Sequence, residues 1–84
     1  MHQFARTPKQ LGAILRRERR KAGNTQEELG GRIKHRQATI SKVESGEPGT
    51  RVDTLLDILA ALNLELVIRP RTKGTPEEIE ALFR

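Results

Sequence analysis

Apolar residues at intervals of three and four predict a first helix in residues 8–22, PKQLGAILRRERRKA. Thr7 can cap the start of this helix, and Pro8 suits its first position, where no intrahelical N–H bond is lost. Gly23 can end it in a left-handed conformation. The predicted buried stripe consists of Leu11, Ile14, Leu15 and Ala22.

A second, shorter helix is predicted from residue 26. Thr25 and Glu28 have the spacing of a capping box, and an apolar repeat of four residues follows at Leu29 and Ile33. The pair Gly30–Gly31 lies inside this helix, where each glycine costs about 1 kcal/mol relative to alanine. A glycine inside a short helix often marks a position where another backbone passes close by.

The third predicted helix covers residues 36–46, RQATISKVESG, and has few apolar positions. Ile40 and Val43 can face a core, and Gly46 can end the helix. Hydroxyl, amide and basic side chains fill most of the remaining positions. The residues predicted to face outward are Arg36, Gln37, Ala38, Ser41 and Lys42.

Residues 51–63, RVDTLLDILAALN, predict a fourth helix, with Thr50 and Asp53 interpreted as its capping box. Its buried stripe would consist of Leu55, Ile58, Leu59 and Leu62. The next segment, residues 64–70 (LELVIRP), alternates with a period of two and ends at Pro70, which predicts a half-buried strand. The strand residues assigned to pairing are Leu64, Leu66, Val67 and Ile68.

A single strand needs a partner for its backbone N–H and C=O groups, and the sequence shows no second strand. Antiparallel pairing with a second copy about a two-fold axis would supply one. We therefore favour a homodimer over a monomer. The expected fold is all-α: a helix-turn-helix bundle of four to five helices in residues 1–69, with the strand forming an intermolecular two-stranded sheet. Residues 70–84 form a tail, either flexible or a short helix.

Composition narrows the function. The chain has 84 residues, enough for one domain, and no cysteine, while His2 and His35 are isolated and make no metal site. We expect no signal peptide, because the N-terminus has no apolar run, and no membrane contact, because Asp57 and Asn63 interrupt the longest apolar stretch. These features predict a cytoplasmic protein without enzymatic activity, cofactor or metal.

The charge distribution points to a polyanionic partner. The net charge is +5 and the pI about 10.5. Residues 75–84 carry a net charge of −2, which leaves +7 on residues 1–74. The basic residues cluster in RRERRK (16–21) and again between residues 32 and 42. Such clusters attract polyanions, although a basic surface that only contacts solvent is the alternative interpretation.

Two short helices joined by a tight turn, the second with a polar face, indicate a helix-turn-helix. The major groove of B-DNA admits one α-helix and displays a distinct donor and acceptor pattern for each base pair. Gln37 can pair with adenine, and Ala38 is small enough to approach a thymine methyl group. The side chains of Arg36, Ser41 and Lys42 can reach bases or phosphates.

The sequence resembles the Xre/Cro family of bacterial helix-turn-helix regulators through TQEEL (25–29) and TISKVESG (39–46), over about residues 8–69. The resemblance implies a lambda-repressor-like bundle, a phosphate contact by Gln26 and an ion pair between Arg19 and Glu44. It also implies that residues matching Gln37, Ala38 and Lys42 read bases. The candidate DNA-backbone contacts are Thr25, Gln26, Arg32, Lys34 and Thr39. The charge pattern adds further phosphate-contact candidates, with solvated surface as the alternative for most of them: Arg16, Arg17, Arg20, Lys21 and Arg51.

Within that family, RQATISKVE, TLLDILAALNLEL and LELVIRP are similar to the HipB-like antitoxins of HipBA toxin–antitoxin modules. This similarity implies a nucleoid-associated homodimer that represses its own operon at a palindromic operator and binds a HipA-like serine/threonine kinase toxin. The candidate toxin contacts in the tail are Ile79, Leu82 and Phe83. The alternative is a stand-alone Xre-family regulator without a toxin partner.

The turn departs from the family pattern. Family members usually have alanine at the position of Gly30, glycine at Lys34 and an aliphatic residue at His35. Lys34 must therefore adopt a left-handed conformation, or the turn must differ, at a cost of about 1 kcal/mol. We interpret His35 as a partly buried turn residue rather than a ligand or a pH sensor.

Overall fold

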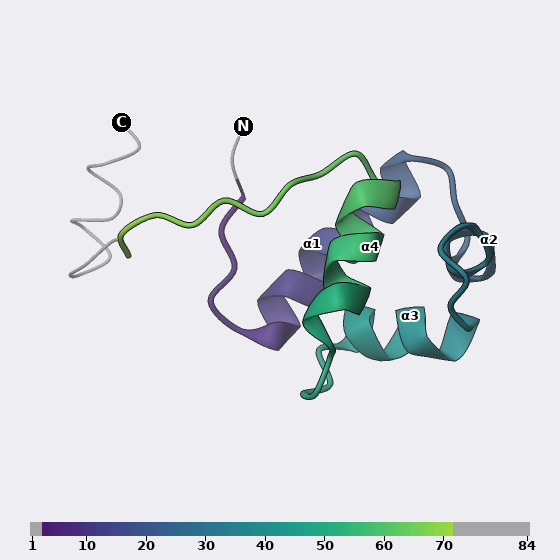
Figure 1. The fold of residues 1–84 in the computed structure, drawn as a ribbon, viewed down its shortest axis with the longest axis horizontal. Helices are drawn as coiled ribbons and strands as arrows, with labels where there is room; N and C mark the ends of the chain where they lie inside the picture. The colour runs from purple at the N-terminus through teal and green to yellow at the C-terminus, as the bar shows by residue number, and fades with distance from the viewer. Residues whose placement is uncertain (1–2, 72–84) are drawn as a thin grey trace.

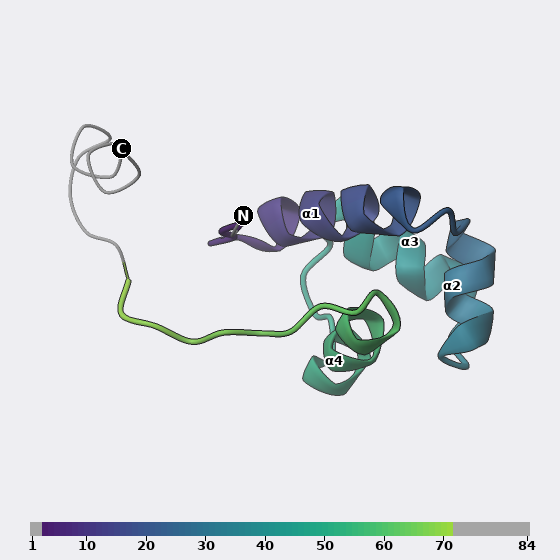
Figure 2. The same ribbon diagram turned by 90° about the horizontal axis from the view of Figure 1, so that it is seen from above.

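The structure is a computed structural model that describes residues 3–71. Four helices follow one another in these residues: α1 (Pro8–Lys21), α2 (Gln26–Arg32), α3 (Gln37–Ser45) and α4 (Val52–Ala61) (Figure 1). The helix α2 lies at the end of the bundle where α1 ends and α3 begins, as Figures 1 and 2 both show. The four-helix, all-α bundle predicted from the sequence is confirmed.

The ends of α1 follow the predicted signals. Thr7 caps the helix, its Oγ1 accepting a hydrogen bond from the Gln10 backbone N–H at 3.1 Å, and Pro8 is the first helical residue. Gly23 follows the helix with φ +77°. The assignment of Ala22 to the buried stripe is wrong: α1 ends at Lys21, so Ala22 lies past the helix and is exposed.

The helix α2 begins with the predicted capping box. The Thr25 backbone N–H donates to Oε1 of Glu28 at 2.8 Å, and the Glu28 N–H donates back to Oγ1 of Thr25 at 3.0 Å. The hydrogen bond from the Thr25 backbone lowers the pKa of the Glu28 carboxyl, because it favours the ionised form. This cap therefore stabilises the fold at pH values above the ordinary pKa of a glutamate side chain. The stabilisation is lost as the pH falls through the lowered pKa of Glu28.

The turn between α2 and α3 uses the left-handed conformation predicted for Lys34, which has φ +59°. The backbone N–H of His35 donates to the Gly30 carbonyl at 2.8 Å, and a Cβ on Gly30 would lie 2.7 Å from the carbonyl oxygen of His35. Gly30 therefore marks a close backbone approach, as predicted. At Gly31, in contrast, an added Cβ would meet no atom within 4 Å.

The core is centred on α3, whose Ile40 side chain is fully buried. Every helix contributes to it. Its members are Leu15, Leu29, Ile40, Val43, Ile58 and Leu59. The partly buried residues packed around this cluster are Leu11, Ile33, Leu55, Ala61, Leu62 and Leu64.

The helix α4 begins differently from the prediction. Its N-cap is Arg51 rather than Thr50, and no side chain caps it. Asp53 instead accepts hydrogen bonds from the Thr54 N–H at 2.8 Å and from the Arg51 guanidinium at 3.2 Å. The predicted capping box is therefore wrong, because the helix starts at Val52 and Asp53 lies too close to its beginning.

Residues 64–71 have no regular secondary structure in the single chain. Leu64 packs against the core, whereas Leu66, Val67 and Ile68 are 55%, 65% and 90% exposed. The segment runs away from the helices (Figure 1), and the Arg69 guanidinium lies 4.2 Å from the Phe4 ring centroid. The strand stays a prediction. The tail candidates Ile79, Leu82 and Phe83 lie outside the described residues.

Glycine allows α1 to lie directly against the end of α3. A Cβ on Gly12 would overlap the backbone carbonyl oxygens of Val43 and Glu44. The approach continues at Gly46, where a Cβ would lie 2.5 Å from the Cα of Lys9. Since these neighbours are backbone atoms, they cannot move aside as a flexible side chain would.

We predict that Gly12→Ala lowers the free energy of unfolding by about 1–3 kcal/mol, because the overlap outweighs the helix propensity of alanine. Gly31→Ala is the matched control: it lies in open space within a helix and should raise stability by about 1 kcal/mol. Urea unfolding of both variants measures the difference. A Gly12→Ala protein as stable as the parent would show that α1 can move away from α3 without cost.

Candidate nucleic-acid interface

A buried ion pair joins α1 to α3. The guanidinium of Arg19 donates from Nε to Oε2 of Glu44 at 2.6 Å and from Nη2 to Oε1 at 3.0 Å. Both side chains are more than nine-tenths buried, with 8% and 5% of their surfaces exposed. The hydrogen bonds that Arg19 donates to the Glu44 carboxylate raise the pKa of Arg19 above its ordinary value. The remaining Nη1 donates to the Asn24 carbonyl at 2.7 Å, which ties the loop between α1 and α2 to the same pair.

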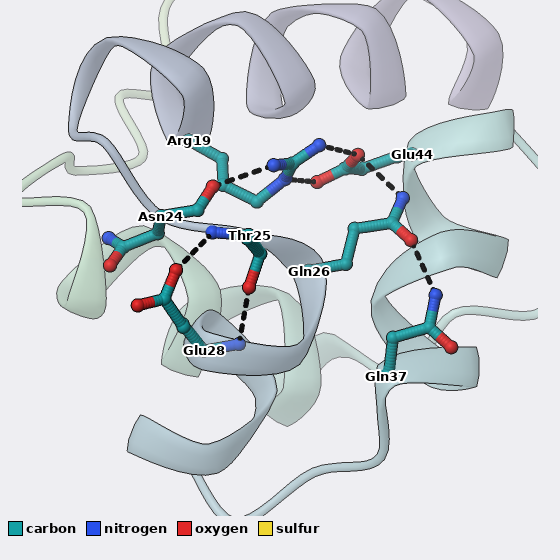
Figure 3. Close-up of polar contacts among 7 residues, drawn as sticks. All are labelled: Arg19, Asn24, Thr25, Gln26, Glu28, Gln37 and Glu44. Atoms are coloured by element: carbon teal, nitrogen blue, oxygen red, sulfur yellow. Dashed lines mark hydrogen bonds and ion pairs between the residues drawn. The ribbon is translucent and has the colours of Figure 1, made fainter.

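The hydrogen bonds continue from this pair to the surface (Figure 3). Nε2 of Gln26 donates to Oε1 of Glu44 at 3.0 Å, and Oε1 of Gln26 accepts from Nε2 of Gln37 at 2.6 Å. Gln26 and Gln37 are the first residues of α2 and α3, so this contact fixes the beginnings of the two helices relative to each other. The exposed Gln37 side chain is therefore oriented before any ligand arrives.

The predicted base-reading residues lie on the side of α3 opposite its buried residues. Arg36 is the N-cap, Gln37, Ala38 and Lys42 are exposed, and Ser41 is half-buried. We call these five residues the α3 face. Its composition matches a major-groove surface, with an amide, a small apolar group, a hydroxyl and two cations.

The residues predicted to contact the DNA backbone differ in their exposure and in the hydrogen bonds that they already make. Arg32 ends α2 and is exposed, and Lys34 is exposed in the left-handed turn. Thr25 is exposed but its hydroxyl accepts the capping hydrogen bond, while Thr39 is half-buried. Gln26 keeps one amide N–H beyond the one it donates to Glu44, and this N–H can donate to a phosphate.

His35 sits where the turn meets α4. Its Nε2 lies 3.4 Å from Oδ2 of Asp57, and its side chain is half-buried. This placement agrees with a turn residue. Among the residues that the structure describes, no three His, Asp or Glu side chains are grouped as metal ligands. None of the helices within residues 3–71 is both long enough and apolar enough to cross a bilayer.

The contact between Gln26 and Gln37 is not predicted by the sequence analysis. These residues are separated by eleven positions, and their distance depends on the turn geometry. The signal present in the sequence is an amide residue at the start of each helix, directly after Thr25 and Arg36. These two amide residues are therefore candidates for a contact, but the sequence alone does not determine whether their side chains meet.

A family model described as helix-turn-helix (HTH_3) matches residues 15–68. The Antitoxin HipB of Escherichia coli K12 is 34% identical over 74 residues, which cover 88% of this chain and 84% of the relative. The chain belongs to the helix-turn-helix family that includes the HipB antitoxins. The HipB of E. coli O6:H1, strain CFT073, is also 34% identical, over 79% of its length.

Solved HipB structures share the fold. A structure described as a HipB-O4 20mer complex has a TM-score of 0.75 at 33% identity, covering 82% of this chain and 97% of that one. A structure described as a HipA-HipB-O2-O3 complex gives the same score, identity and coverage. The likeness therefore covers most of both chains.

We predict that Glu44→Ala lowers the free energy of unfolding by about 3–5 kcal/mol, because it leaves the buried Arg19 charge unpaired. Glu47→Ala is the matched control: it removes the same side chain from an exposed position and should change stability by less than about 0.5 kcal/mol. Thermal and urea unfolding measure both. Equal midpoints for the two variants would mean that the ion pair adds nothing to stability.

Proposed function

We propose that this chain is a sequence-specific DNA-binding antitoxin that represses its own operon. The observation that carries the proposal is the α3 face, an exposed polar surface whose first helical side chain, Gln37, is held by Gln26 at 2.6 Å. Relatives at 34% identity are HipB antitoxins, and structures of similar fold are named as complexes of HipB with O2, O3 or O4 and of HipB with HipA.

In this proposal the α3 face enters the major groove. Gln37 pairs through its amide with an adenine, and Ala38 packs against a thymine methyl group. The other side chains of the α3 face contact bases or phosphates, depending on their distance from the floor of the groove; they are Arg36, Ser41 and Lys42. Gln26 donates its second N–H to a phosphate, so one side chain would connect the duplex to the Arg19–Glu44 pair.

The active form is a homodimer. Among the described residues, the exposed apolar side chains of α4 are Val52 and Leu56, and those of the following segment are Leu66, Val67 and Ile68. Exposed apolar side chains on an extended segment favour pairing of that segment with another chain. A two-fold pair of residues 64–68 would form the intermolecular sheet and place two α3 faces about 34 Å apart, the spacing of an inverted repeat.

The protein partner is a HipA-type serine/threonine kinase toxin. The tail, residues 70–84, is the segment proposed to contact it, through Ile79, Leu82 and Phe83. The helices would then remain available for DNA, so that one chain serves both partners. A regulator without a toxin partner is the second candidate, and the tail distinguishes the two.

We predict different effects for the two kinds of DNA contact. Gln37→Ala should cost about 1–3 kcal/mol of binding to the preferred sequence and relax the preference at that base pair. Arg32→Ala should weaken binding to all sequences alike and reduce the slope of log K against log salt by about 0.9. Fluorescence anisotropy with a selected duplex and its scrambled counterpart measures both variants.

The scrambled duplex is the internal control for these two variants, and unchanged thermal midpoints show that both remain folded. Loss of affinity by Gln37→Ala that is the same on both duplexes would contradict base reading by the α3 face. A chain that prefers no sequence at all would contradict the proposed function.

We predict that deletion of residues 72–84 abolishes capture of a co-expressed HipA-type kinase and leaves DNA affinity unchanged, because the described helices do not include the deleted segment. Affinity purification of the kinase with the full and the shortened chain measures the first effect, and anisotropy measures the second. Capture by the shortened chain would place the contact on the helices, and capture by neither chain would favour a stand-alone regulator.

A further inference from the structure

A basic groove lies between α1 and the end of α3. It is open to solvent and has a volume of about 710 Å³. Ala13 of α1 and the last residues of α3, Glu44 and Ser45, form part of its lining. Its basic residues, all exposed, are Lys9, Arg16, Arg17, Arg20 and Lys21. We call it the α1 groove.

The charges of the α1 groove are largely uncompensated. Among the described residues that line it, the one carboxylate is that of Glu44, which is already paired with the buried Arg19. Arg17 donates to the neutral amide oxygen of Gln3 at 2.9 Å, which leaves its charge intact. Lys21 lies 3.6 Å from Glu18 and is largely exposed.

The remaining three cations, Lys9, Arg16 and Arg20, have no acidic side chain within 4.0 Å among residues 3–71. Repulsion among cations on one surface is relieved by a bound polyanion. The α1 groove therefore has the charge of a polyanion site without an internal partner.

The arrangement of these cations suits an extended ligand rather than a small anion. Lys9, Arg16 and Arg20 are separated by seven and four residues, so they follow one face of α1, with the small Ala13 between them. At 1.5 Å of rise per residue, the row from Lys9 to Arg20 is about 16 Å long. A DNA strand carries one phosphate for every 3.4 Å or so of helix axis, so a row laid parallel to that axis would span about five phosphates of one strand.

The α1 groove begins where the α3 face ends. Ser45 lines the groove and lies one turn beyond Ser41 and Lys42 on α3. Gly46 allows the backbone of Lys9, at the start of α1, to lie directly against the end of α3. The Arg19–Glu44 pair, visible between α1 and α3 in Figure 3, fixes their relative position.

We propose that the α1 groove is a second DNA contact, which binds phosphates of the duplex beyond the base pairs read by the α3 face. This inference rests on the proposed DNA-binding function and extends the contacted length of each half-site. Guanidinium groups are suited to phosphate oxygens, and such contacts position a protein on DNA without reading sequence. The groove thus adds affinity and salt dependence, while specificity stays with α3.

The test compares two synthetic duplexes carrying the sequence that the protein selects from a random library. The core duplex ends at the last selected base pair, and the extended duplex adds about six base pairs, or 20 Å of axis, at each end. The double variant Arg16→Gln/Arg20→Gln removes two exposed charges from the groove. Arg71→Gln is the matched control, because Arg71 is exposed on the segment that leaves the bundle.

The parent and Arg71→Gln should bind the extended duplex more tightly than the core duplex. The double variant should lose this gain, and its slope of log K against log salt on the extended duplex should be shallower by about 1.8, or 0.9 per lost contact. Its relative preference among sequences should not change. Ethylation of the outer phosphates should interfere with binding of the parent and not of the double variant.

Equal affinity of the parent for both duplexes, with sequence preference retained, would overturn the groove contact and leave the proposed function intact. A double variant that keeps the gain on the extended duplex but no longer captures a HipA-type kinase would identify the groove as a protein surface instead. A parent that binds no duplex would overturn the proposed function and this inference with it. If the double variant does not fold, Lys9→Gln/Lys21→Gln replaces it in the same comparison.

Discussion

The buried Arg19–Glu44 ion pair is the constraint on which the arrangement of this domain depends. Two charges removed from water are tolerated only when their hydrogen bonds are satisfied, and here Glu44 accepts two bonds from Arg19 and one from Gln26. The donors come from α1 and α2 and the acceptor from α3. Because the pair is costly to break and directional, it fixes the angle between these helices more tightly than apolar contacts alone would. The Gln26 side chain, bonded to this pair, in turn accepts a hydrogen bond from Gln37 at the surface.

The composition of α3 explains why such a constraint is useful. A helix that meets a DNA groove must leave much of its surface polar, so it has few side chains with which to hold itself in the core. In α3 only Ile40, Val43 and Glu44 are buried. The helix therefore combines a small apolar contact with a buried charge and with the close backbone approach at Gly12. The side of α3 that faces outward is polar and makes few contacts within the fold. The buried ion pair and the close backbone approach on its other side therefore hold the helix in place.

The sequence predicted the parts of this structure that depend on neighbours along the chain. The caps at Thr7 and Thr25 follow from local geometry and are found as predicted. The family resemblance implied either a left-handed Lys34 or a different turn, and Lys34 is left-handed. The errors occur where the exact helix boundary decides the outcome, as for the capping box at Thr50 and the burial of Ala22. Contacts between distant residues, such as Gln26 with Gln37, and the extension of the basic surface to Lys9 and Ser45, depend on how the helices cross. Composition and periodicity do not determine that crossing.

The segment after α4 contains the exposed apolar residues through which two chains are proposed to pair. Leu64 packs against the core, so the segment starts in a fixed position, but its next apolar residues, Leu66 to Ile68, have no cover within the described chain. In the proposed homodimer a second copy would cover them. Leu64 follows the end of α4 at Ala61 by three residues, and α4 contributes to the same core as α3. A two-fold pairing at this segment would therefore set the separation of the two α3 faces through rigid contacts rather than through a flexible linker. The same few residues would then set both the apolar burial in the dimer and the spacing of the operator half-sites. A substitution that loosens the pairing would therefore also relax the half-site spacing that the protein accepts.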